Sequence, residues 1–215
     1  MFKLNNKGMT TAEILVSFIL VALISTTIYA TVSNYNIRRE LESNKLQINT
    51  YKNLLTKDIQ DDLIKDGLVK VTKRQFLSDN TDIFVADFDL KSGTTKRIVI
   101  KRRLTDNYVV TNPTRNYDDY FTIYYGVPTG PRVDDNLYVS QSYDDSSMIR
   151  NLTEYPIPDF GYGVNKIDKK VKDLRLTNVI INTDNNTLSL FIGFDHLQLA
   201  TRYAINIVCP INYTT

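Results

Sequence analysis

Hydrophobic residues are distributed along this chain in two different ways, one before and one after Gly67. From residue 14 through residue 37 no side chain carries a charge, and the first part of this run is almost purely aliphatic. As an α-helix the run is about 36 Å long, enough to cross a hydrocarbon core of about 30 Å. Core helices of soluble proteins seldom run so long without a charge. The pattern therefore predicts a membrane-spanning helix.

The helical pattern continues past the uncharged run and becomes amphipathic. Charged residues mostly occupy the faces that the apolar residues leave. No proline occurs before Pro113, and Gly67 is suited to end a helix. The sequence predicts one unbroken helix from about Met9 to about Lys65. Its apolar positions beyond the uncharged run are Ile37, Leu41, Ile48, Tyr51, Leu55, Ile59 and Leu63.

After Gly67 the period of the pattern changes from helical to alternating, which is typical of strands. Short turn-forming segments separate most of the alternating runs, so neighbouring strands are expected to pair antiparallel. One hairpin is expected to turn at Gly93. The segment 144–170, rich in Tyr, Pro, Gly and Asn, is expected to form a long surface loop. The expected strands are 83–90, 96–104, 120–127, 136–142, 174–182, 187–194 and 202–209.

These patterns together predict an α+β fold, in which the distal half of a long N-terminal helix packs against an antiparallel sheet. The expected organisation is a helix over 9–66 that is transmembrane to about residue 37, followed by a sheet domain over 67–215. A chain of 215 residues is long enough to bury such a core.

Composition and motifs give little support to enzymatic chemistry. The formal net charge of +2 provides no global attraction to nucleic acid. Cys209 is the single cysteine and is expected to be a small buried residue, so no internal disulfide forms. His196, the single histidine, lies between expected strands and is expected to be a structural or loop residue rather than a catalyst. The sequence has no phosphate-binding loop and no nucleophile elbow, so we expect no enzyme and no cofactor.

Two charged features have a functional alternative. Lys96, Arg97, Lys101, Arg102 and Arg103 crowd one hairpin arm and are candidate contacts to DNA phosphates, as would suit an uptake system. Strand alternation sends Lys96 and Arg102 to one face and the other three to the opposite face, so ordinary solvated charge is favoured. Likewise, paired loop aspartates would suit calcium, but a solvated acidic surface is favoured over a metal site; the pairs are Asp118-Asp119, Asp134-Asp135 and Asp144-Asp145.

One carboxylate, Glu13, stands at the head of the apolar run. A carboxylate at membrane depth costs about 2.5–3.5 kcal/mol on insertion scales, so it is usually retained for a partner. Lys7 is close to Glu13 in sequence and is one candidate for the cation that pairs with it. Cleavage after Gly8 would instead give Met9 a new α-amino group four residues from Glu13. If Glu13 met that amine in a neighbouring copy, the pair would set the axial register between subunits.

At these residues the sequence "KGMTTAEILVSFILVAL" resembles the N-terminus of type IV pilins and pseudopilins. The resemblance covers about the first thirty residues. It implies that residues 1–8 are a prepilin leader removed by a prepilin peptidase that cleaves after Gly8, that the Met9 amine is methylated, and that Glu13 contacts a neighbouring subunit. It also implies a single-pass protein of the cytoplasmic (inner) membrane with its C-terminal domain outside. Such subunits are extracted from lipid by an assembly platform into a cell-surface filament.

The chain departs from the family pattern at several points. The pair Thr10-Thr11 replaces the more usual threonine and leucine, and no cysteine pair closes a C-terminal loop. Ala30 stands where many major pilins have a helix-bending proline, which favours a minor pilin or pseudopilin. The expected function is thus that of a structural subunit of a type IV pilus-like filament. The alternatives are a DNA-binding or adhesive pilus subunit, and a membrane-anchored surface domain that never polymerises.

Two other membrane interpretations compete with prepilin processing. An ordinary secretory signal would be cleaved after the apolar run, near Ala30, and would not normally contain a glutamate. A plain signal anchor would keep the whole run and would have no use for Gly8 beside Glu13. We therefore favour cleavage after Gly8.

Overall fold

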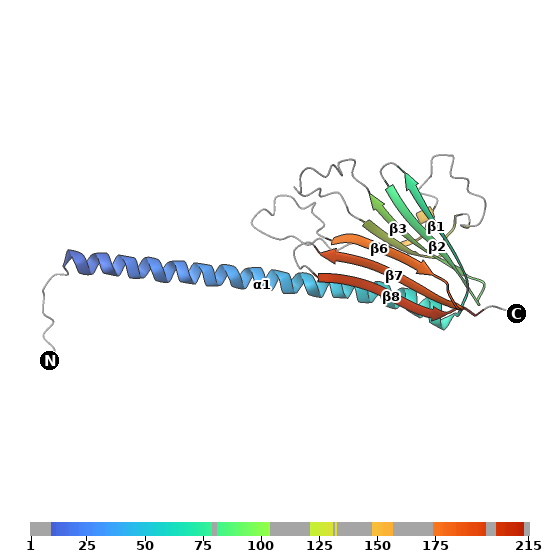
Figure 1. Cartoon of the computed structure of the whole chain (residues 1–215), viewed down its shortest axis with the longest axis horizontal. Helices are drawn as coiled ribbons and strands as arrows, with labels where there is room; N and C mark the ends of the chain where they lie inside the picture. Colours follow the sequence, from blue (N-terminus) through green and yellow to red (C-terminus); the bar gives the residue numbers. More distant parts are fainter. Residues whose placement is uncertain are drawn as a thin grey trace. The chain divides into compact units, whose positions relative to one another are not determined.

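The computed structural model describes residues 10–78, 81–103, 121–130, 132, 148–156, 174–196 and 201–212. One helix, α1 (Thr11–Lys65), precedes two antiparallel sheets, so the predicted α+β architecture is confirmed (Figure 1). The chain divides into two compact units, Met1–Ser43 and Asn44–Thr215. We call the first the N-terminal unit and the second the head unit. The head unit thus includes the last part of α1 as well as both sheets.

Helix α1 ends where the sequence predicted. The last helical residue is Lys65, and Gly67 has a φ of 71°, a left-handed conformation that glycine adopts without a Cβ penalty. The chain then turns into the first strand, and the backbone N–H of Lys91 donates to the carbonyl of Gly67 at 2.9 Å. The start of the helix is Thr11, close to the predicted Met9.

The first sheet has five strands that pair in chain order: β1 (Leu68–Ser78), β2 (Thr81–Leu90), β3 (Thr95–Arg103), β4 (Phe121–Gly126) and β5 (Thr153–Tyr155). The predicted hairpin joins β2 to β3, and Gly93 has a φ of 81° in its turn. Strands β1 and β5 were not predicted. The predicted strand 136–142 lies outside the described residues.

The expectation of an uninterrupted loop over 144–170 is corrected where the structure describes it. Residues 148–156 form a helical turn followed by β5, which pairs with β4 and extends the sheet. Three residues are too few to show a strand period, which is why the pattern did not indicate β5.

The second sheet has three strands in the order β6 (Leu174–Asn182), β7 (Thr187–His196) and β8 (Thr201–Pro210). These are the last three predicted strands, and His196 is the end of β7 rather than part of a loop. The turn from β6 to β7 places Asn185 and Asn186 at positive φ. The sequence predicted one sheet and the structure has two, joined by an isolated parallel bridge between Leu68 and Ile211.

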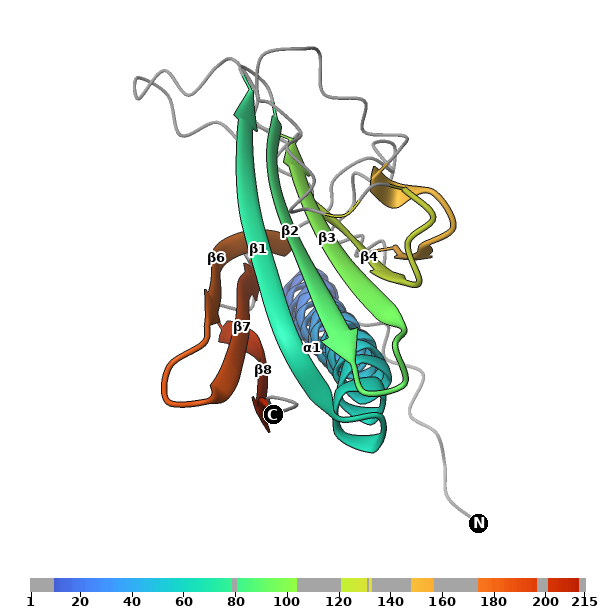
Figure 2. The ribbon, with the colours of Figure 1, turned by 90° about the vertical axis from the view of Figure 1, so that its right-hand side faces the viewer.

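The main core of the head unit lies between α1 and the inner faces of both sheets (Figure 2). Ile48, Leu55 and Ile59 of α1 are fully buried. Phe194 of β7 has its ring centroid 6.4 Å from that of Tyr51 on α1 and 6.2 Å from that of Phe121 on β4. One aromatic ring therefore contacts the helix and connects the two sheets.

A second, smaller core covers the outer face of the five-stranded sheet. Ile83, Val85 and Val99 are buried there, and Ile149 and Leu152 pack over them. The segment 148–156 therefore closes the outer face with its first residues and adds an edge strand with its last.

Candidate functional site

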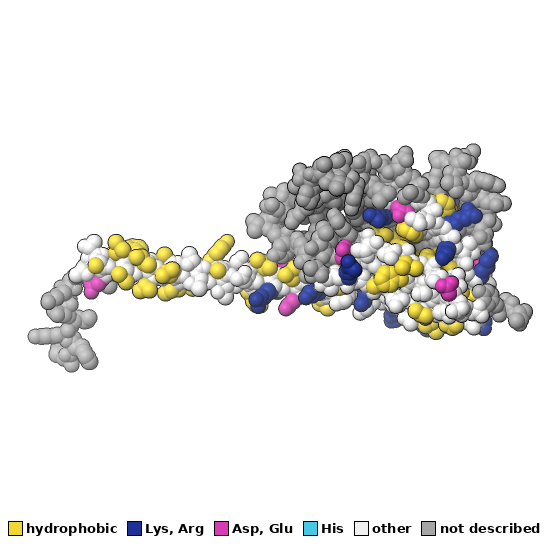
Figure 3. Space-filling model, in the orientation of Figure 1, with side chains coloured by type: hydrophobic (Ala, Val, Ile, Leu, Met, Phe, Trp, Pro, Cys, Tyr) yellow, Lys and Arg dark blue, Asp and Glu magenta, His cyan; other side chains and the backbone are white. Residues whose placement is uncertain are grey.

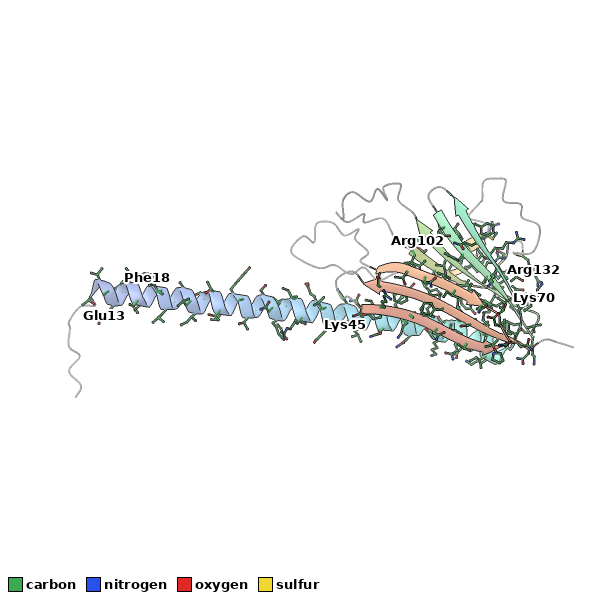
Figure 4. All side chains as sticks on the ribbon, viewed as in Figure 1. Glu13, Phe18, Lys45, Lys70, Arg102 and Arg132 are labelled. Atoms are coloured by element: carbon green, nitrogen blue, oxygen red, sulfur yellow. The ribbon has the colours of Figure 1, made fainter. Side chains whose placement is uncertain are left out.

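The first turn of α1 is built around a reciprocal contact between Thr10 and Glu13. The backbone N–H of Thr10 donates to Glu13 Oε2 at 2.7 Å, and the Thr10 hydroxyl donates to the same oxygen at 3.0 Å. In return, the backbone N–H of Glu13 lies 3.4 Å from Thr10 Oγ1. This is a capping box, which satisfies N–H groups that the helix leaves open at its start. Glu13, labelled at the start of α1 in Figure 4, is thus a helix-capping residue.

Four hydroxyl groups of the apolar run donate to backbone carbonyls of α1 itself. Ser17 donates to the carbonyl of Glu13 at 2.8 Å, and Thr31 donates to that of Thr27 at 2.8 Å. Thr26 and Thr27 likewise donate to carbonyls one turn earlier. A hydroxyl bonded back to its own helix needs no water, so these side chains are compatible with a lipid environment.

The N-terminal part of α1 is long and apolar enough to span a membrane. The large apolar side chains of this stretch are exposed, and Figure 3 shows apolar groups covering the surface of the helix there. Phe18, for example, is 72% exposed, which in water would be an unfavourable position for a phenyl ring. An exposed apolar surface of this extent indicates contact with lipid or with another apolar surface.

The structure describes only one of the three predicted processing and assembly residues. Gly8 and Met9 lie outside the described residues. Glu13 is described, and its described partner is Thr10. A contact of Glu13 with the Met9 amine of a neighbouring copy stays a prediction.

Polar contacts that the sequence did not indicate attach α1 to the five-stranded sheet. Tyr155 donates its hydroxyl to Asp58 at 2.6 Å, and Tyr125 donates to Asp62 at 3.0 Å. Lys96 Nζ lies 2.9 Å from the same Asp62 carboxylate. Burial, followed by the contact with the carboxylate, raises the pKa of Tyr125 and of Tyr155. Both phenols therefore stay protonated and donate to α1 at neutral pH.

The basic arm of β3 is divided between the two faces of the sheet, as alternation predicted for Lys96 and Arg97. Lys96 faces α1, whereas Arg97 is fully buried on the outer side with its guanidinium paired to Asp87. Arg97 Nε and Nη2 lie 2.6 and 2.7 Å from the two Asp87 oxygens, and Met148 Sδ is 3.6 Å from Nη1. A phosphate would have to displace Asp87 to reach this group. This burial removes Arg97 from the candidate DNA contacts.

The remaining cations of the arm are less enclosed. Lys101 and Arg102 are half-buried on opposite faces of β3. Arg103 ends the strand, and its side chain is not among those described. The five cations therefore do not form one surface patch.

The other residues considered for chemistry do not come together. In the described ranges no group of three or more His, Cys, Asp or Glu side chains is placed to hold a metal ion. Cys209 is buried, as predicted, and burial raises the pKa of its thiol to about 11. The three aspartate pairs considered for calcium lie outside the described residues.

Comparison with protein-family models, with curated proteins and with solved structures finds no match to this chain.

Proposed function

We propose that this chain is a structural subunit of a type IV pilus-like filament, of the minor pilin or pseudopilin kind. The observation that carries the proposal is the N-terminal unit itself. It presents a helix whose apolar residues are exposed, four of whose hydroxyls donate to its own backbone, and which carries Glu13 in its first turn as the one carboxylate between residues 10 and 39. Such a helix suits lipid first and the apolar interior of a filament afterwards.

In this proposal the two environments are exchanged without refolding. Lipid tails and aliphatic side chains are about equally apolar, so packing and the satisfaction of polar groups decide whether helices associate. Glu13 is the polar group whose satisfaction would favour association, because its carboxylate is costly at membrane depth unless a cation reaches it. An amine at the start of a neighbouring helix would relieve that cost at one axial offset only.

The proposed cellular setting follows from the same features. The unprocessed chain would lie in the cytoplasmic (inner) membrane as a single-pass protein, with the head unit outside. Its partners would be a prepilin peptidase that cuts after Gly8, the assembly platform, and other pilin subunits.

Mass spectrometry of the N-terminal peptide tests the processing step directly. The sample is the full chain from the native membrane and from the sheared surface fraction. A peptide that begins with methylated Met9 is the expected result. An intact Met1 start would indicate an anchored surface domain, and a start near Thr31 would indicate a secreted protein; either outcome overturns the proposal.

Substitutions in the first turn separate capping from assembly. Gln is accepted in a capping box, so Glu13→Gln keeps the cap and removes the charge, whereas Thr10→Ala weakens the cap and keeps the charge. We expect Glu13→Gln and Glu13→Ala to lose incorporation into filaments while cleavage continues, and Thr10→Ala to retain incorporation. The opposite ranking would mean that Glu13 acts through the helix cap alone.

The DNA-binding alternative receives less support from the site. Arg97 is unavailable, and Lys101 and Arg102 lie on opposite faces of β3. Binding of the full chain to duplex DNA that weakens steeply with salt would revive this alternative. We expect no such binding at low salt.

A further inference from the structure

An apolar groove of about 590 Å³ runs between α1 and the segment that forms β5. On the helix side it is lined by the exposed Leu46 and Leu54 and by the buried Tyr51. Tyr155 and Pro156 line the opposite side. All of these residues belong to the head unit. A groove of this size and composition is a docking surface for another apolar element.

The charges on the groove are all acidic. Asp58 and Glu154 line it, and no lysine or arginine is among its described lining residues. The Tyr155 hydroxyl donates to Asp58 at 2.6 Å, and Glu154 is exposed. Asp58 is the last groove residue of α1 and therefore marks one end of the groove. The element that fits is therefore apolar along its length and cationic at one end.

The N-terminal unit carries a surface with this character. Ile28, Val32 and Tyr35 follow one another at spacings of four and three on α1, and Arg39 continues the same stripe. All four side chains are exposed. From residue 28 to residue 39 the stripe rises about 16 Å, and from residue 46 to residue 58 the groove side of α1 rises about 18 Å. The two surfaces therefore match in length as well as in charge.

We propose that the groove binds the 28–39 stripe of a second copy of this chain, with the two helices parallel. The parallel direction brings Arg39 to the Asp58 end and brings Ile28 to the apolar end at Leu46. Residue 28 of one copy then lies beside residue 46 of the other, and residue 39 beside residue 58, so the paired positions differ by 18 or 19 residues. This difference offsets the two copies by about 27–29 Å along the helix axis. Because each copy uses a different surface, the contact is heterologous and can propagate along a filament.

This inference rests on the proposed function and adds the surface that receives the neighbouring helix. Two copies that both span the bilayer lie at about the same depth. An offset of about 27–29 Å would move one of the two uncharged runs almost entirely out of a hydrocarbon core of about 30 Å, so two membrane-inserted copies cannot form this contact. The contact therefore forms when one copy has been moved out of the lipid relative to the other.

Cysteine crosslinking in cells that make the filament tests the contact. One full-length chain carries Leu54→Cys, a differently tagged chain carries Tyr35→Cys, which is 19 positions away as the offset requires, and a short bis-maleimide joins them. The native Cys209 is buried and serves as the unreactive background. Matched controls are Asn34→Cys, on another face of the N-terminal unit, and Ile64→Cys, which is exposed on α1 outside the groove. We expect the 54–35 pair to exceed both control pairs by about tenfold in the sheared filaments.

Charge reversal provides a second readout that does not depend on cysteine chemistry. Arg39→Glu is expected to lower filament incorporation by about fivefold or more, because it brings a carboxylate to the acidic end of the groove. Glu154→Arg in the same chain is expected to restore at least part of the loss. Arg38→Glu, which changes the same charge one position away on a different face, is the control and should have little effect.

The outcomes separate this contact from the proposed function. Processed chains in filaments without the 54–35 crosslink would overturn the contact and leave the function standing. A 54–35 crosslink in the membrane fraction would overturn the offset. Absence of the chain from the sheared fraction would overturn the proposed function and, with it, the contact.

Discussion

The two parts of α1 are one helix, but different surroundings specify them. In the N-terminal unit the large apolar side chains are exposed all around the helix. In the head unit a single stripe at helical spacing is buried, while Leu46, Leu54 and Ile64 on the other faces remain exposed. The buried stripe consists of Asn44, Ile48, Tyr51, Leu55, Ile59 and Leu63.

The difference shows that the same secondary structure has two physical causes. The first part is rich in Ile, Val and Thr, which are only moderate helix formers in water. In hydrocarbon, however, backbone groups must bond internally, and a helix satisfies this requirement. The second part is helical because its stripe packs against two sheets, since isolated helices are marginal in water. Perturbations of the sheets should therefore affect the second part only.

Alkaline pH is expected to have the largest effect on the head unit. Burial raises the pKa of Tyr51, Tyr125 and Tyr155 above the ordinary value of 10.0, and Asp58 and Asp62 raise it further for the last two. A tyrosine whose pKa is raised in the folded state stabilises the fold at pH values below its unfolded-state pKa. This contribution is lost as the pH rises through the folded-state pKa. From pH 10 upward the free energy of unfolding should fall by about 1.4 kcal/mol per pH unit for each tyrosine that stays protonated.

Urea unfolding of the full chain in detergent, monitored by circular dichroism at pH values from 8 to 11, measures this loss. Ultraviolet absorbance of the same samples counts the tyrosinates. If all tyrosines ionised near pH 10 without a loss of stability, the polar contacts between α1 and the sheet would have no energetic role.

Truncation of one leucine in each part of α1 tests the comparison most directly. Leu55 is fully buried, so Leu55→Ala should lower the free energy of unfolding of the head unit by about 2–5 kcal/mol. Leu20 is 53% exposed, and Leu20→Ala should leave that free energy unchanged. Denaturant unfolding of both full-length variants in the same detergent provides the measurement. Equal losses would mean that the two parts unfold as one unit.

Removal of one hydroxyl tests the polar attachment of α1. Tyr155→Phe leaves the Asp58 carboxylate without the donor at 2.6 Å, and hydrogen bonds to charged groups contribute about 1.5–3 kcal/mol. Tyr35 is 65% exposed in the N-terminal unit, so Tyr35→Phe is the matched control and should change nothing in the head unit. The same unfolding experiment compares them, and a silent Tyr155→Phe would remove the attachment from the account.

The smallest effect is expected at the start of the helix. Caps of this kind contribute about 0.5–2 kcal/mol, so Thr10→Ala should speed hydrogen exchange of the amides in the first turn by a few-fold. Thr31 donates to a carbonyl in the middle of the helix, and Thr31→Ala should leave those amides unaffected. Head-unit stability should not change in either variant. Unchanged exchange after Thr10→Ala would mean that Glu13 caps the helix without its partner.

Strong local patterns predicted most of the fold. The strands β6, β7 and β8 alternate clearly, and Gly67 and Gly93 are the residues that their left-handed conformations favour. Strand β1 was missed because "LVKVTKRQFLS" places polar residues on both faces, as an edge strand tolerates. The division into two sheets was missed because pairing between distant strands leaves no local signal.

The candidate site was predicted less completely. The capping box was present in the sequence as Thr10 followed three residues later by Glu13, so this signal was available and was not used. Asn44, which begins the buried stripe and whose Nδ2 has no partner within the described part of the chain, falls outside any apolar pattern. The Asp87–Arg97 pair was hidden because the two residues are cross-strand neighbours and charge alone suggests exposure.

The bridge between Leu68 and Ile211 joins residues separated by 143 positions, the first residue of β1 and the residue that follows β8. Asn212 reinforces it by donating to the Leu68 carbonyl at 2.7 Å. Contacts so distant in sequence slow folding, because a long loop must close before they form. During synthesis the buried stripe of α1 emerges well before β6, β7 and β8 can cover it. A newly made chain therefore passes through an interval of vulnerability to aggregation and proteolysis that lasts until its final residues are in place.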